Sequence, residues 1–399
     1  MIKRNQLSCI MGGLCLLTQT AFAANLDISE GNWEIKYDQA TKNVDYIQSG
    51  KTILADVFVK AKNAAGIELL SSTYTNVELK KEAVQDNFGA GNKYTYTYKT
   101  AGKETLEQVF YFYTGRDYLL TEAYLLSDNS IGINWISPLM TQSVNEFLPT
   151  NGDYRILDMP FDNDSFRGYS AQTWSIAKNG GTSCEASAIY DVTTRNGLVV
   201  GSVEHSTWKT GVFYQTSTSN KVRELRVFGG LVDARTNDVR PEKGPVVTEH
   251  GKVFGKRIKS PKIFVGYFND WRNGMDKYGE ANAIVAPKLP WDGGTIFGWQ
   301  SWGGMAERVN YEGACNVSDF FATDLSNVKN EQGTVYMILD SFWDNMTETQ
   351  LRNFVKRCKK NGQIPGIYFC PFSFWGGEND LGWKVNGSDY TYNDIVLRA

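Results

Sequence analysis

The stretch from Thr295 to Gly377 contains three short apolar runs, and each run ends in polar or aromatic residues. They read TIFGW followed by QSWGG (295–304), TVYMILD followed by SFWD (334–344), and IPGIYFC followed by PFSFWGG (364–377). Continuous apolar runs of this length are typical of strands buried on both faces, as in parallel sheets covered by helices. We therefore predict three parallel strands here.

The segments between these runs have helical periodicity. From Asn316, apolar residues recur on one side up to Gly333, and they are Phe320, Phe321, Leu325 and Val328. In the next segment, Thr347 and Gln350 form a capping box, with Met346 and Leu351 placed as a hydrophobic staple. Leu351, Phe354, Val355 and Cys358 then recur at helical spacing, and Gly362 closes the helix. The predicted order is strand, helix, strand, helix, strand.

Aromatic residues and one carboxylate gather where the predicted strands end. In βα units the carboxyl ends of the strands form the chemical face, because the loops that follow them build its mouth. Indole rings stack on the apolar face of a pyranose, and a carboxylate accepts hydrogen bonds from sugar hydroxyls. The sequence therefore predicts a sugar site, with Trp299, Trp302, Asp340, Trp343 and Trp375 as candidate binding residues.

The same motifs resemble a known family. GWQSWG at 298–303, ILD at 338–340 followed by Trp343, and PGIYFCPF at 365–372 are similar to the first three barrel strands of the α-galactosidase clan of glycoside hydrolases. The resemblance implies a large antiparallel β-sandwich followed by a (β/α)8 barrel, with Asp340 binding sugar hydroxyls. It departs at Ser341, where the family has a second aspartate, so the resemblance does not specify the sugar.

The resemblance also implies where the chemistry of hydrolysis takes place. Retaining glycosidases need two carboxylates, one as the nucleophile and one as the acid/base. In the resembled family these end the fourth and sixth barrel strands. A full barrel takes about 250 residues, and the segment after Gly294 provides about three βα units, so we expect no catalytic residue within this chain and the pair beyond Ala399. No cofactor is expected.

The sequence before this segment predicts an antiparallel β-sandwich. Between Asn25 and Val265, runs such as NWEIKYD (32–38) and KYTYTYKT (93–100) alternate apolar with polar residues and are separated by turn residues. Residues 268–285 change to helical spacing, and a Pro- and Gly-rich connector follows. We predict a sandwich with a linking helix at 24–285, a connector at 286–294 and the first part of a barrel at 295–399.

One loop of the predicted sandwich, DMPFDNDSFRGY at 158–169, concentrates carboxylates around a proline. Three interpretations remain open for Asp162 and Asp164: a loop held together by Arg167, a loop that contacts the sugar, or a calcium site.

The chain begins with features of a secretory signal peptide. Lys3 and Arg4 precede an apolar segment, and Ala21-Phe22-Ala23 provides a small-residue cleavage site, so we expect residues 1–23 to be removed and the protein to be periplasmic or extracellular. No stretch is long enough to span a membrane. The formal net charge of −3, or about −5 without Lys3 and Arg4, argues against nucleic acid as a partner.

Cysteine and histidine usage excludes other common chemistries. Cys184, Cys315, Cys358 and Cys370 follow no metal-ligand spacing, so no metal site is predicted and disulfide pairing stays open. With only two histidines, neither a Ser-His-Asp triad nor a zinc site is favoured.

The leading hypothesis is that the chain is the N-terminal portion of an exported α-galactosidase-like retaining glycoside hydrolase that acts on α-galactosides or related glycans. The alternatives are a non-catalytic carbohydrate-binding protein and an exported structural domain that docks on a partner. The sequence does not determine the oligomeric state.

Overall fold

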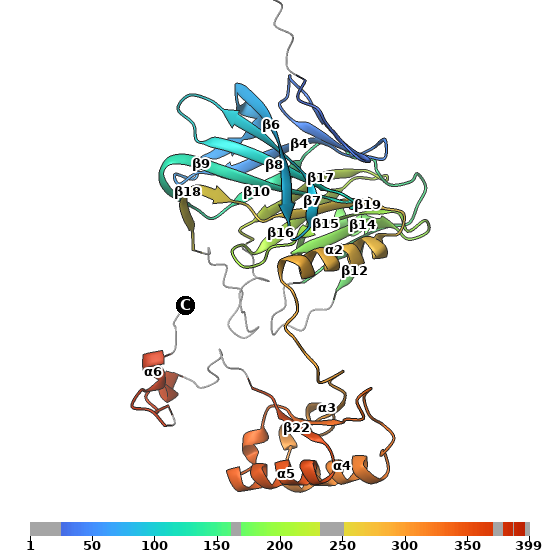
Figure 1. Cartoon of the computed structure of the whole chain (residues 1–399), viewed down its shortest axis with the longest axis vertical. Coiled ribbons are helices and arrows are strands. Elements are labelled where there is room, and N and C mark those ends of the chain that lie inside the picture. Colours follow the sequence, from blue (N-terminus) through green and yellow to red (C-terminus); the bar gives the residue numbers. More distant parts are fainter. Residues whose placement is uncertain (1–24, 161–168, 232–250, 370–377, 386, 396–399) are drawn as a thin grey trace, which may run out of the picture. The chain divides into compact units, whose positions relative to one another are not determined.

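A computed structural model describes residues 25–160, 169–231, 251–369, 378–385 and 387–395. The chain divides into two compact units, Met1–Lys288 and Leu289–Ala399. Figure 1 shows the first as layered sheets and the second as a small sheet with helices.

The first unit is built almost entirely from antiparallel strands, which form two large sheets. One sheet has nine strands in the order β1-β2-β3-β4-β10-β17-β16-β13, with β5 paired to β4. Its members are β1 (Ile28–Glu30), β2 (Trp33–Tyr37), β3 (Val44–Gln48), β4 (Lys51–Lys62), β5 (Glu68–Leu70), β10 (Ile136–Thr141), β13 (Gly181–Cys184), β16 (Thr210–Thr216) and β17 (Val222–Gly229).

The other sheet has ten strands in the order β12-β11-β14-β15-β19-β9-β8-β7-β6, with β18 paired to β9. Its members are β6 (Asn76–Asp86), β7 (Gly89–Lys99), β8 (Thr105–Tyr113), β9 (Leu119–Ile133), β11 (Tyr154–Asp158), β12 (Ser170–Thr173), β14 (Ala186–Asp191), β15 (Gly197–Ser202), β18 (Val253–Lys259) and β19 (Ile263–Phe268). A short helix, α1 (Trp174–Ala177), follows β12.

The alternating pattern in the sequence explains how these sheets pack. In β7, Tyr94, Tyr96 and Tyr98 are buried, while the threonines between them lie on the other face. Residues of both sheets share one hydrophobic core, as expected for a sandwich whose inner faces are apolar. The predicted antiparallel β-sandwich is therefore confirmed.

The predicted helix after the sandwich strands is also present, as α2 (Trp271–Val285). It begins where the Asp270 side chain accepts a hydrogen bond from the backbone N–H of Arg272 at 3.0 Å. Trp271, Met275, Tyr278 and Ala281 pack on the ten-stranded sheet over β15 and β19 (Figure 1). The helix thus covers the outer face of that sheet.

The second unit contains a parallel sheet in the order β20-β21-β22, from β20 (Gly298–Gln300), β21 (Tyr336–Leu339) and β22 (Ile364–Ile367). Its helices are α3 (Trp302–Met305), α4 (Tyr311–Thr323), α5 (Glu348–Lys360) and α6 (Tyr392–Ile395). Short 3-10 turns are η1 (Ser71–Thr73) in the first unit and η3 (Ala306–Arg308), η4 (Trp343–Asn345) and η5 (Glu378–Asp380) in this one.

Both long helices of the second unit pack on the same face of this sheet. Met337 and Leu339 of β21 share a core with residues of α4 and of α5, and Figure 1 shows the two helices on one side. The predicted capping box at Thr347 and Gln350 starts α5, and Phe354 and Cys358 are buried as predicted. The predicted strand and helix order of this segment is confirmed.

The predicted start of the first helix was wrong. It begins at Tyr311 rather than near Asn316, because the Asn310 side chain accepts the N–H of Gly313 at 2.9 Å and caps the helix. The buried face is consequently Ala314, Cys315 and Ser318. Two residues predicted on that face, Phe320 and Val328, are exposed.

The prediction that all three strands are buried on both faces was also wrong for the outer two. Of the three strands of this sheet, β21 is the one that is largely buried. Phe297, just before β20, and Ile364 and Ile367 of β22 are exposed. The reason is positional, since the outer strands of a three-stranded sheet each lack a neighbour on one side.

No helix in the described residues is long and apolar enough to cross a membrane.

A histidine links α2 to the sandwich. His205 contacts Glu185 through Nδ1 at 2.9 Å and the Asn282 side-chain oxygen of α2 through Nε2 at 2.6 Å. Both neighbours present acceptors, so the arrangement suits a doubly protonated ring. The hydrogen bond to Glu185, helped by that to Asn282, outweighs burial and raises the pKa of His205 above its ordinary value.

We predict that this link stabilises the protein more in acid. Because the pKa is raised in the folded state, the contribution is complete below the ordinary histidine value of about 6.5 and disappears as pH rises through the folded value. His205→Gln should therefore reduce the free energy of unfolding more at about pH 5.5 than at about pH 8. Urea unfolding of both proteins at each pH measures this, and an equal loss at both would contradict it.

Candidate functional site

The ends of β20 and β21 are joined at one buried serine. Ser301 is fully buried, and its backbone N–H donates to the Ile338 carbonyl at 3.0 Å. Its hydroxyl oxygen accepts the backbone N–H of Asp340 at 2.8 Å. These bonds continue the parallel register, in which Gln300 pairs with Ile338. They hold the residues that follow the two strands, Trp302 and Asp340, at the same end of the sheet.

Two aromatic rings are exposed at this end. Trp302 and Phe342 stack with ring centroids 6.2 Å apart and an interplanar angle of 21°. Their exposures are 45% and 40%, which is high for large apolar side chains in contact. Together they form an exposed aromatic surface of the kind that binds the apolar face of a sugar ring.

Phe342 has an unusual backbone conformation, with φ of +66°. This left-handed region is disfavoured for a bulky residue, and such strain tends to occur at binding and catalytic sites. Here it starts the η4 turn immediately after Asp340 and Ser341. Sequence analysis did not select Phe342, although its place two residues after a strand-end aspartate was a usable signal.

The Asp340 carboxylate is half-buried and uses one of its oxygens locally. Oδ1 accepts the backbone N–H of Ser341 at 2.5 Å, which orients the following loop. The structure shows no partner for Oδ2 among the described residues. The side chain therefore shapes the loop and still offers an oxygen to a ligand.

The other predicted tryptophans have different surroundings. The Trp343 indole N–H donates to the Tyr368 carbonyl at 3.0 Å, tying the loop after β21 to the end of β22. Trp299 packs in the core between sheet and helices, together with Met337, its partner in the register. The structure thus brings together Trp302, Asp340 and Phe342, while Trp299 lies toward the helices.

The remaining candidates, Trp375, Asp162 and Asp164, lie outside the described residues, so their roles stay predictions. Within the described residues, no group of three His, Cys, Asp or Glu side chains is placed to hold a metal ion. Cys184, Cys315 and Cys358 are buried and form no disulfide within the described part of the chain.

No family model and no curated protein matches the chain. Among solved structures, a β-arabinopyranosidase matches 86% of this chain and 55% of its own, with a TM-score of 0.54 and 11% identity. The GH36 α-galactosidase AgaA from Geobacillus stearothermophilus matches 91% and 59%, with a TM-score of 0.50 and 10% identity. The galactosidase domain of the α-galactosidase-sucrose kinase AgaSK matches 89% and 58%, with a TM-score of 0.50 and 10% identity.

These similarities show the fold. The chain has a melibiase-like, glycoside hydrolase-related fold, which confirms the resemblance found in the sequence motifs. The chain spans less than three-fifths of the length of each of these structures.

We predict that Ser301→Ala destabilises the site by more than the removal of one small hydroxyl group suggests. The change leaves the Asp340 N–H without its acceptor at a buried position, which costs about 1–3 kcal/mol. Urea unfolding and the exchange rate of the Asp340 amide hydrogen measure the loss. Ser326→Ala, at an exposed position after α4, is the matched control and should change neither. Equal behaviour of the two variants would contradict the role given to Ser301.

Proposed function

We propose that this chain provides carbohydrate recognition in an exported α-galactosidase-like retaining glycoside hydrolase, acting on α-galactosides or related glycans. The observation that carries the proposal is the exposed Trp302–Phe342 pair beside Asp340, at the carboxyl ends of two parallel strands. The similarity to glycoside hydrolase structures supports it at the level of fold.

The proposal includes the start of a (β/α)8 barrel. The strands follow one another in sheet order, and both α4 and α5 pack on one face, which is the arrangement of barrel units. A doubly wound sheet would place helices on both faces. The exposed apolar side chains at Phe297, Ile364 and Ile367 suit a sheet that continues into further strands.

Within this site each residue has a chemical role. The apolar C–H face of a pyranose would stack on Trp302, with Phe342 extending the same surface. The free oxygen of Asp340 would accept a hydrogen bond from a sugar hydroxyl, which is stronger than a neutral hydrogen bond because the acceptor is ionised. The site would thereby fix the position and face of one sugar ring.

Bond cleavage needs more than this site contains. Retaining hydrolysis requires a nucleophile and an acid/base about 5–5.5 Å apart. Among the described residues, Asp340 is the one carboxylate that directly follows a strand of the parallel sheet. We therefore assign no catalytic residue to the described strands, and we expect the pair on later barrel strands.

The same observation favours a second candidate function. A site with aromatic surfaces and a single carboxylate can bind a glycan without cleaving it, so this chain by itself would act as a carbohydrate-binding protein. The two functions share the sugar site and differ in turnover. Incubation of p-nitrophenyl α-galactoside with a protein that includes the later barrel strands distinguishes them, since nitrophenol release indicates the hydrolase and binding without release indicates the binder.

We predict that Asp340→Asn weakens binding of galactose or p-nitrophenyl α-galactoside by about 1–3 kcal/mol, the cost of losing a charged hydrogen bond. Titration calorimetry measures the change. Asp344→Asn is the matched control, because Asp344 is an exposed carboxylate four residues away, and it should bind like the unaltered protein. Unchanged affinity in Asp340→Asn would remove Asp340 from the site.

We also predict that Trp302→Ala weakens binding of the same ligands, by about 1–3 kcal/mol by analogy with other stacking contacts. Trp302 is half-exposed and not part of the buried core, so the melting temperature should change little. Unaltered affinity, measured by the same titration, would show that the aromatic pair is not the sugar surface.

A further inference from the structure

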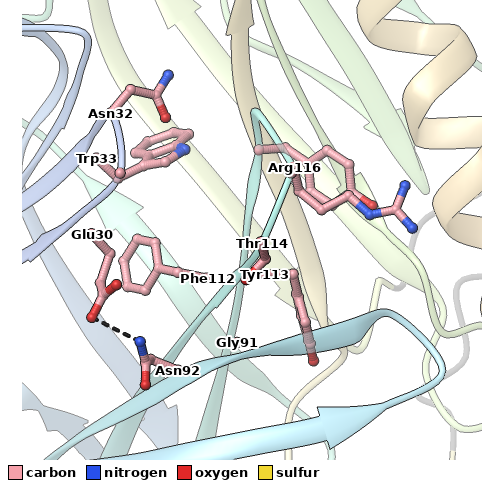
Figure 2. Close-up of a pocket in the computed structure, with 12 residues that line it drawn as sticks. Glu30, Asn32, Trp33, Gly91, Asn92, Phe112, Tyr113, Thr114 and Arg116 are labelled. Atoms are coloured by element: carbon pink, nitrogen blue, oxygen red, sulfur yellow. Dashed lines mark hydrogen bonds between the residues drawn. The ribbon is translucent and has the colours of Figure 1, made fainter.

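A pocket of about 280 Å³ lies at one end of the β-sandwich, far in sequence from the strands of the proposed sugar site. Its walls come from both sheets: the turn between β1 and β2 on one side, and β7 with the end of β8 on the other. Figure 2 shows Trp33 and Glu30 on one wall and Phe112, Tyr113 and Asn92 on the other. A volume near the lower end of ligand pockets, roughly 300 Å³, suits a ligand of about one sugar ring.

Glu30 is the carboxylate of this pocket, and it is fixed on one side. Its Oε1 accepts hydrogen bonds from Lys81 at 2.7 Å, Asn92 at 3.0 Å and Tyr94 at 2.5 Å. No described residue donates to Oε2, and Figure 2 shows this second oxygen turned toward Phe112. Burial opposes ionisation, but the hydrogen bonds outweigh it and lower the pKa of Glu30. The pocket therefore contains an ionised acceptor.

Two buried donors at the same pocket have no hydrogen-bond partner among the described residues. They are the Trp33 indole N–H and the Tyr118 hydroxyl, and each residue is only 2% exposed. A buried polar group without a partner is costly, and such groups are rare in folded proteins. Their occurrence together at one pocket indicates that a group other than the described residues satisfies them.

We propose that this pocket is a second binding site, and that its ligand is a neutral sugar unit. A sugar hydroxyl both donates and accepts, so a sugar can pair with an indole or phenol donor and with a carboxylate acceptor, which are the groups present at this pocket. The Glu30 carboxylate would repel an anionic ligand, and the one cation among the lining residues, Arg116, lies over the Tyr118 ring, with its guanidinium carbon 6.0 Å from the ring centroid. The Phe112 ring supplies an apolar surface for the C–H face of the sugar.

The two turns at the mouth of the pocket contain glycines. The turns on either side contain Gly31 and Gly115, with φ of +61° and +76° and open space around each. Glycine adopts these conformations without strain, so the turns can adjust at low cost. Because both donor atoms are buried, the proposal requires these turns to move outward when the ligand binds.

The first test follows the indole N–H of Trp33 by NMR in the whole chain, with its resonance assigned by its loss in Trp33→Phe. We expect D-galactose to shift this resonance in a saturable way and D-glucuronate to shift it less at equal concentration. If neither sugar moves the resonance, no sugar binds there. A larger, saturable response to glucuronate would overturn the assignment of a neutral ligand.

The second test compares a tyrosine of the pocket with one outside it. Tyr118→Phe removes a hydroxyl that has no partner among the described residues, so we expect the melting temperature to stay or rise while the affinity for galactose at the Trp33 resonance falls about fivefold. Tyr111→Phe is the matched control, because Tyr111 does not line the pocket and its hydroxyl donates to Glu122 at 2.7 Å. It should lower stability and keep the affinity. Equal affinity of both variants would refute the role of Tyr118.

This inference and the proposed function can fail separately. Trp302→Ala should weaken binding at the strand-end site and leave the galactose response of the Trp33 resonance unchanged. Tyr118→Phe should leave binding at the strand-end site unchanged and lower the affinity for galactose at the Trp33 resonance. If Trp302→Ala also abolished the Trp33 response, the pocket would not be an independent site.

Discussion

The candidate sugar site depends on the paired hydrogen bonds at Ser301. Parallel strands deliver their following residues to one edge of a sheet, but the loops after them are free to diverge. Because the backbone N–H of Ser301 and its hydroxyl both bond to β21 or to the residue after it, the two loops leave the sheet together. Because the two loops begin side by side, Trp302 and Phe342 can stack although they are forty residues apart in sequence.

A second constraint acts on the sheet itself. Helices α4 and α5 cover one face of the β20-β21-β22 sheet. Its opposite face and both of its edges must therefore pack against other groups or be exposed to water. The exposed Phe297, which precedes β20, and the exposed Ile364 and Ile367 of β22 show that the described strands do not provide this cover. This is a reason to expect that the small sheet is more stable in a larger assembly of strands than alone.

Sequence predicted the parts of this fold that local patterns determine. The capping box of α5 and the alternation in β7 depend on neighbouring residues, and both were predicted correctly. The start of α4 was missed because the Asn310 cap was overlooked in favour of the later apolar residues. The left-handed conformation of Phe342 and the convergence of Glu30 with Tyr94, 64 residues later, arise from tertiary contacts that no local pattern encodes. Sequence therefore predicted that Trp302 and Asp340 lie at the same end of the sheet, and it could not predict the pocket between the sandwich sheets.

The indole groups of Trp343 and Trp33 differ in their hydrogen bonding. This difference separates a structural role from a binding role. The Trp343 N–H is donated to the Tyr368 carbonyl, and its ring helps to hold the loop after β21. The Trp33 N–H, although more deeply buried, is donated to no atom of the described chain. A buried donor contributes to stability when it is paired and costs stability when it is not. The hydrogen bond of Trp343 therefore gives this residue a structural role. The Trp33 N–H gains a hydrogen bond when a ligand supplies the missing acceptor.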